Sequence, residues 1–115
     1  MTPYKRGDVV LVAFPFTDLT TTKMRPGVVV SSDRFNKKYN DLIIAAITSQ
    51  IPKNLSEEEF SLSRTDQESA GLPKVSLIKL GKLVTPDQRL VRKKLGKIPE
   101  ETLLKLTSAL HEVLK

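Results

Sequence analysis

The chain of 115 residues lacks cysteine and tryptophan, and it contains a single histidine. Disulfides, thiolate nucleophiles and cysteine-based zinc sites are therefore excluded. The five glycines are scattered singly, which excludes a glycine-rich phosphate loop. No run approaches the roughly 18 apolar residues of a membrane-spanning helix. The first residues also lack the apolar core of a secretory signal. We therefore expect a cytoplasmic protein with no membrane attachment, no metal and no cofactor.

Hydrophobic residues make up 39% of the chain and charged residues 28%, a balance typical of a folded soluble domain. The length suits a single domain spanning residues 1–115. The net charge is +6 and the pI is about 9.7, which favours a polyanionic partner. Seven lysines and arginines fall between residues 79 and 97, against one acid, Asp87. A solvated basic face without a dedicated partner is the alternative.

Short apolar runs separated by turn residues predict strands at 9–14, 26–31, 42–47, 59–63, 75–80, 82–85 and 91–98. Short helical turns are expected at 34–37 and 87–90, a kink at Gly81, and polar loops at 16–23 and 64–71. Leucines recurring every three or four residues predict an amphipathic helix from Pro99 to Leu114. The predicted fold class is mainly β (α+β). It is a small, strongly bent barrel of five to seven strands whose C-terminal helix covers an open side.

Two polar residues stand at the ends of predicted buried strands. Arg25 precedes Pro26, which suits the first residue of a strand because it has no amide hydrogen. Thr48 stands where the run 42–47 ends. A guanidinium and a hydroxyl could together hold a phosphodiester and stabilise charge on its oxygens. On position alone, Arg25 as one more solvated charge is an equally good interpretation. His111 is expected to be a surface residue, and the carboxylates suggest no acid–base pair.

Several stretches, in this order, resemble the MazF/PemK-like toxins of type II toxin–antitoxin systems. They are residues 7–12 (Gly-Asp-Val-Val-Leu-Val), 14–18 (Phe-Pro-Phe-Thr-Asp), 25–31 (Arg-Pro-Gly-Val-Val-Val-Ser) and 46–49 (Ala-Ile-Thr-Ser). The tail is similar too, through residues 71–74 (Gly-Leu-Pro-Lys) and 90–98. The resemblance extends from about Lys5 to Leu114, and the combination is more specific than any one stretch.

This resemblance implies an SH3-like barrel that works as a homodimer and cleaves single-stranded RNA at a short sequence without metal. The implied products carry a 2′,3′-cyclic phosphate and a 5′-hydroxyl. Arg25 and Thr48 match the family's catalytic arginine and threonine. We predict RNA contacts at Phe16, Thr17, Thr20, Lys23, Ser49, Gln50, Lys79 and Lys82. Thr20 stands where many members carry a glutamate, which puts an inherited cleavage sequence in doubt.

The resemblance also implies an acidic, partly disordered antitoxin that lies across the RNA site, with operator DNA bound only through the toxin–antitoxin complex. Two other functions stay open on the same fold. One is a gyrase poison of the CcdB type, although the chain lacks that family's C-terminal tryptophan. The other is a catalytically silent barrel that binds only antitoxin and operator DNA. Substitution of Arg25 and Thr48 separates the nuclease from both.

Overall fold

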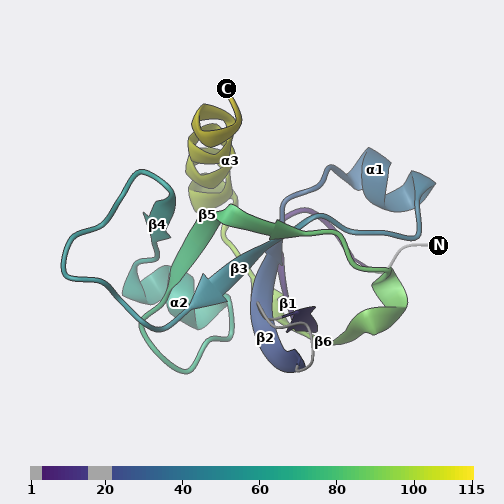
Figure 1. Cartoon of the computed structure of the whole chain (residues 1–115), viewed down its shortest axis with the longest axis horizontal. Helices are drawn as coiled ribbons and strands as arrows, with labels where there is room; N and C mark the ends of the chain where they lie inside the picture. The colour runs from purple at the N-terminus through teal and green to yellow at the C-terminus, as the bar shows by residue number, and fades with distance from the viewer. Residues whose placement is uncertain (1–3, 16–21) are drawn as a thin grey trace.

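The computed structural model describes residues 4–15 and 22–115. Its strands are β1 (Asp8–Pro15), β2 (Thr22–Val29), β3 (Ile44–Thr48), β4 (Glu59–Ser61), β5 (Leu77–Val84) and β6 (Val91–Lys97). The helices are α1 (Asp33–Lys38), α2 (Arg64–Ser69) and α3 (Glu100–Leu114), with a 3₁₀ turn η1 (Gln88–Leu90). Figure 1 shows the sheet curving through the middle of the molecule, with α3 projecting from it. None of these helices is long and apolar enough to cross a membrane.

The six strands form one antiparallel sheet in the order β4-β5-β3-β2-β1-β6. The mainly-β class with a C-terminal helix is therefore confirmed. The expected closure into a barrel is not, because the described parts of the edge strands β4 and β6 do not pair with each other. The end of α2 lies against β6 instead. A Cβ built on Gly96 would sit 2.4 Å from the Ser69 carbonyl oxygen.

The sheet is buried on both faces, which explains why its central strands are continuous apolar runs. One face holds Val9, Val28, Ala45 and Ile78, and Leu106 of α3 packs into the same cluster. The other face holds a smaller cluster: Val10, Val12, Val29, Leu42, Ile44 and Ala46. Neighbours along β1 thus alternate between the two clusters, as the pleat of a strand requires.

Pro26 lies inside β2, although it was expected to begin the strand. The N–H of Val30 donates to the Ile43 carbonyl at 2.9 Å, so every second residue of β2 turns its nitrogen toward β3. Pro26 falls in that series, but β2 and β3 stop pairing at Gly27 and Ala46. Its missing amide hydrogen coincides with the end of this ladder, and β2 extends back to Thr22 through pairing with β1.

Residues 64–71 were predicted to be a polar loop, and this is wrong, because six of them form α2. The helix is set by a capping box rather than by an apolar stripe. The N–H of Asp66 donates to the Ser63 hydroxyl at 3.1 Å, and the N–H of Ser63 donates to the Asp66 carboxylate at 3.3 Å. Thr102 of α3 also donates to Asp66 at 2.8 Å, which ties α2 to the terminal helix.

The strands expected at 75–80 and 82–85 are one strand, β5. The kink expected at Gly81 is present as a change of register. Ala45 pairs with Leu83, but Ala46 pairs with Lys79, so three residues of β5 bulge between them. The bulge lets one strand bend while it stays paired to β3.

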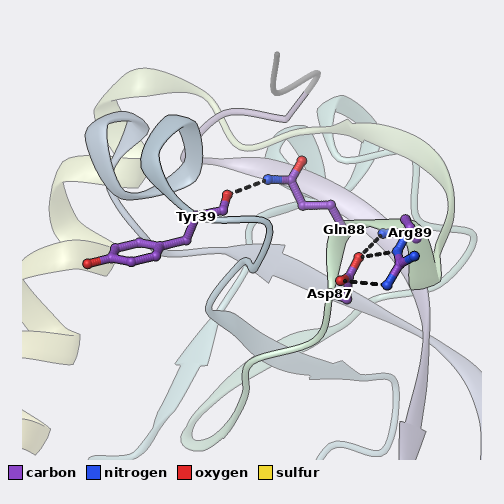
Figure 2. A network of polar contacts seen from close by, with 4 residues as sticks. All are labelled: Tyr39, Asp87, Gln88 and Arg89. Carbon is purple, nitrogen blue, oxygen red and sulfur yellow. Dashed lines mark hydrogen bonds and ion pairs between the residues drawn. The ribbon is translucent and has the colours of Figure 1, made fainter.

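The turn predicted at 87–90 is confirmed as η1, and it is fixed by polar contacts (Figure 2). The Asp87 carboxylate accepts from the Arg89 backbone N–H at 2.8 Å and from its guanidinium at 3.1 and 3.2 Å. Gln88 donates to the carbonyl of Tyr39 at 3.3 Å (Figure 2). It also donates to the carbonyl of Asn36 at 3.1 Å. The connection between β5 and β6 is thereby joined to the end of α1.

Candidate active site

A cleft of about 430 Å³ opens beside β2 and β3, and it brings Arg25 and Thr48 together. Its described lining consists of Leu11, Arg25, Pro26, Ile47, Thr48, Ser49, Gly71, Leu72, Pro73, Lys74, Ser76, Lys93 and Leu95. These residues come from four strands, from Ser49 directly after β3, and from the segment that joins α2 to β5. The cleft is therefore assembled by the tertiary fold and not by one local motif.

The strand register explains why residues so far apart in sequence share this cleft. The last pair between β2 and β3 is Gly27 with Ala46. Because the strands are antiparallel, two further steps along this register would set Arg25 opposite Thr48. Pro26 offers no N–H for the next ladder bond, so the strands can separate at this point. The separation leaves Arg25 and Thr48 beside an opening instead of inside a sheet.

The Thr48 hydroxyl is oriented by its own chain. The backbone N–H of Gln50 donates to Thr48 Oγ1 at 3.1 Å. The hydroxyl oxygen thus accepts a bond from the backbone, and its own hydrogen can be given to a ligand. Thr48 is half-buried, and it is paired with Leu77 of β5 through the ladder. This placement on a strand end holds the donor in a fixed position.

The segment after α2 is a rigid part of the lining. The N–H of Leu72 donates to the Gln67 carbonyl at 3.1 Å, and the Gln67 side chain returns a bond to the Leu72 carbonyl at 3.1 Å. The buried Ser76 hydroxyl donates to the Lys74 carbonyl at 2.8 Å. These bonds at both ends hold the backbone that carries Lys74.

Two glycines set the distance between this segment and β6. Gly71 has a φ of 72°, and a Cβ there would lie 2.1 Å from the Leu95 carbonyl oxygen. Gly96 approaches Ser69 and Ala70 in the same way, since a Cβ there would lie 2.4 Å from the Ser69 carbonyl oxygen. Only glycine allows such close contact between two backbones. Because Gly71 and Leu95 both line the cleft, this contact fixes part of its width.

The predicted RNA-contacting residues are distributed unevenly around this cleft. Ser49 lines it, and the backbone of Gln50 orients Thr48. Lys23 is exposed on β2, two residues before Arg25. Lys79 and Lys82 lie on β5 and are not part of the described lining. Three further predicted residues, Phe16, Thr17 and Thr20, lie outside the described residues.

Lys79 instead lies opposite Glu59 of β4 in the strand register. The backbone N–H of Ser56 donates to the Glu59 carboxylate at 2.9 Å. This bond, more than the charge of Lys79, holds the pKa of Glu59 below its ordinary value.

Two cations of the cleft, Lys74 and Lys93, were not among the predicted site residues, although Lys93 belongs to the basic stretch 79–97. Lys74 is the last residue of the stretch 71–74, which is one of the stretches that resemble the family. Lys93 and Leu95 lie two residues apart on β6, and both face the cleft. With Arg25 they give the described lining three cations and no carboxylate. In the part of the chain that the structure describes, no three His, Asp or Glu side chains are grouped to hold a metal ion.

Comparison with known proteins shows the same fold. A mycobacterial structure described as an endoribonuclease in complex with its cognate antitoxin has a TM-score of 0.77 at 17% identity, covering 96% of this chain and 94% of its own. A mycobacterial endoribonuclease has a TM-score of 0.75 at 19% identity over 99% and 93%. A MazE–MazF complex from Deinococcus radiodurans has a TM-score of 0.74 at 18% identity over 96% and 95%.

At these identities the likeness concerns the fold, and no curated protein sequence matches the chain. The family is decided by a model of the whole domain. The model described as "PemK-like, MazF-like toxin of type II toxin-antitoxin system" matches residues 5–114. The chain therefore belongs to the PemK-like, MazF-like toxin family of type II toxin–antitoxin systems.

Proposed function

We propose that this chain is a metal-independent endoribonuclease toxin that cleaves single-stranded, mRNA-type RNA at a short sequence in the cytoplasm. The observation that carries the proposal is the shared cleft of Arg25 and Thr48, which is lined by cations and hydroxyls. Family membership and a fold shared with structures described as endoribonucleases support the same reaction. We extend the proposal to residues 1–115 as a single toxin domain.

The reaction uses a nucleophile that RNA itself carries. The 2′-oxygen forms a bond to the adjacent phosphorus while the bond from phosphorus to the 5′-oxygen breaks. The proton lost by the 2′-hydroxyl passes to water, and the departing 5′-oxygen takes a proton from water. The products are then a 2′,3′-cyclic phosphate and a 5′-hydroxyl. Such a displacement needs stabilisation of charge on the phosphoryl oxygens more than it needs a protein nucleophile.

Arg25 and Thr48 would provide that stabilisation. A guanidinium stays charged in proteins, so Arg25 acts as a charged clamp and hydrogen-bond donor. Thr48 accepts a bond from the Gln50 N–H and directs its hydrogen to a non-bridging oxygen. Lys23, Ser49, Gln50, Lys79 and Lys82 remain proposed RNA contacts, together with Phe16, Thr17 and Thr20.

Thr48 offers a matched pair of substitutions. Thr48→Val keeps the shape of the side chain but removes the hydroxyl, and Thr48→Ser keeps the hydroxyl. We expect Thr48→Val to lower kcat by about 100-fold, the usual effect of losing one donor to a developing oxyanion. Thr48→Ser should retain most activity. Cleavage assays on purified proteins with matching circular dichroism measure this. Wild-type kcat in Thr48→Val would remove Thr48 from the mechanism.

Assembly completes the proposal. We propose a homodimer that is neutralised by a cognate acidic antitoxin and reaches operator DNA only within that complex. Two of the solved relatives are described as complexes with an antitoxin or as MazE–MazF, which supports this kind of partner. Light scattering should give a particle of twice the chain mass of 12.9 kDa. A monomer across micromolar concentrations would contradict the dimer.

A further inference from the structure

The cleft holds two lysines that the proposed reaction does not use. Lys74 comes from the segment after α2, and Lys93 comes from β6. Both are exposed, and neither forms an ion pair among the residues that the structure describes. Lys94, the neighbour of Lys93, is different, since its ammonium lies 3.2 Å from the buried Asp8 carboxylate. Two cations at the cleft are thus available to an anionic ligand.

The backbones that carry these lysines are held in place relative to Arg25 and Thr48. Lys93 pairs in register with Leu11 of β1, which is itself part of the cleft. Lys74 lies on a segment fixed by the Ser76 hydroxyl at 2.8 Å. The close contact of Gly71 with Leu95 joins the segment after α2 to β6, the two backbones that carry the lysines. Each lysine side chain therefore extends from a fixed backbone position, which favours phosphate binding by its ammonium group.

The rest of the lining fits nucleotides. Between its cations the cleft presents Leu11, Pro26, Ile47, Leu72, Pro73 and Leu95, which are apolar. Ser49 and the buried Ser76 add hydroxyl groups. A single-stranded nucleic acid combines charged phosphates with flat apolar bases, and binding grooves for it combine cations with apolar surfaces.

We propose that Lys74 and Lys93 bind backbone phosphates next to the phosphodiester held by Arg25 and Thr48, so that they position single-stranded RNA in the cleft. This inference rests on the proposed endoribonuclease function and adds the residues that hold the flanking nucleotides. Lys74 and Lys93 are positioning residues, since the bond that breaks is held by Arg25 and Thr48. Their contribution should appear in RNA binding and its salt dependence rather than in the rate of the bound complex.

The test measures binding of a mixed-sequence, single-stranded RNA whose 2′-hydroxyls are replaced by fluorine, so that the nucleophile is absent. The variants are Lys74→Ala, Lys93→Ala and the double variant. Each lost phosphate contact should flatten the plot of log affinity against log salt by about 0.7, the value for single strands. With natural RNA, the same variants should raise KM several-fold and leave kcat unchanged.

Lys37→Ala is the matched control. Lys37 is an exposed lysine on α1, an element that contributes nothing to the described lining of the cleft, and its loss changes the net charge equally. We expect this variant to keep the wild-type salt slope. Wild-type slopes in both cleft variants, or an equal change in Lys37→Ala, would overturn the inference.

The outcomes also separate this inference from the proposed function. A lysine-dependent slope in a protein that cleaves no natural RNA would overturn the nuclease and leave the phosphate contacts standing. Normal cleavage with lysine-independent binding would overturn the contacts alone. If the two variants instead lose affinity for a poly-glutamate peptide while their RNA binding is unchanged, the lysines serve an acidic protein and the inference fails.

Discussion

Pro26 shapes the candidate site by what its backbone lacks. The ladder between β2 and β3 ends one residue after it, at Gly27 and Ala46. Without an amide hydrogen, Pro26 cannot add the next bond. Its neighbour Arg25 therefore lies where the strands part, although Arg25 itself stays paired with Val12 of β1. The backbone of Arg25 therefore pairs with β1, and on its other side the ladder with β3 has already ended.

Asp87 gives a prediction about pH at the level of one side chain. Bonds from the Arg89 guanidinium, and then from its backbone N–H, hold the pKa of Asp87 below its ordinary value of 3.8. Because the folded state lowers this pKa, ionised Asp87 stabilises the fold above pH 3.8, and that stability is lost as pH falls through the lower folded pKa. NMR titration of the carboxyl group should find a value below 3.8.

Arg89→Gln is the companion variant for this prediction. It removes the guanidinium that lowers the pKa most, so Asp87 should titrate closer to 3.8. Urea unfolding between pH 7 and pH 2 should show a smaller acid-dependent loss in Asp87→Asn than in the wild type. An Asp87 that titrates at or above 3.8 in the wild-type protein would contradict this reading of the contacts in Figure 2.

Among the elements, α2 links the cleft to the C-terminal helix. Asp66 caps the start of α2 and accepts a bond from Thr102 of α3 at 2.8 Å. The other end of α2 leads into Gly71 and Leu72, which line the cleft. A six-residue helix is too short to be stable alone. Its stability therefore depends on the cap, the contact with α3 and the backbone contact with β6.

The contact between α2 and β6 can be tested with a pair of glycine substitutions. In Gly96→Ala the new Cβ would lie 2.4 Å from the Ser69 carbonyl oxygen, and backbone must move to admit it. We expect a loss of about 1–3 kcal/mol in the free energy of unfolding. RNA cleavage should fall as well, because the segment that carries Lys74 is displaced.

Gly81→Ala is the control, since its Cβ would lie 3.9 Å from the Glu58 side chain, an ordinary contact. We expect its stability to stay within about 0.5 kcal/mol of the wild type, with normal cleavage. Urea unfolding and cleavage assays of both variants provide the measurement. Equal stability of the two variants would show that the α2–β6 contact is not tight.

Elements with strong periodicity were predictable from sequence, and those built by capping were not. The apolar runs at 9–14 and 42–47 and the leucine stripe of α3 correspond to buried elements. Residues 64–69 contain no apolar stripe, so α2 was missed even though Ser63 and Asp66 form a recognisable cap. The start of β2 was missed because Pro26 was taken as its first residue, and only the tertiary register shows why it is tolerated.

At the scale of the whole molecule, the described edge strands of the sheet, β4 and β6, do not pair with each other. The short β4 is followed by α2, and α2 meets β6 through backbone contacts at Gly96. In Figure 1, β4 and α2 lie on the left of the view, away from α1 on the right. The cleft lies where the strands and the segment after α2 meet.

The sequence could suggest the site only in part. Arg25 and Thr48 were identified by resemblance and by their positions at the ends of predicted strands, and the fold brings them to one cleft. Which lysines share that cleft depends on strand register and on the path after α2. Lys74 was therefore not singled out, and Lys93 stood out only as one of seven cations in the stretch 79–97. The net charge of +6 indicated an anionic partner but not the surface that binds it.

The central claim is that this chain cleaves RNA at a site that depends on Arg25, and one experiment tests it most directly. Wild-type protein and Arg25→Ala are incubated with a long single-stranded RNA in excess EDTA, and the ends of the products are identified. We predict cleavage by the wild type alone, leaving 2′,3′-cyclic phosphate and 5′-hydroxyl ends, with a rate at least about 100-fold above the variant. Equal cleavage by both proteins, or none by the wild type, would contradict the claim.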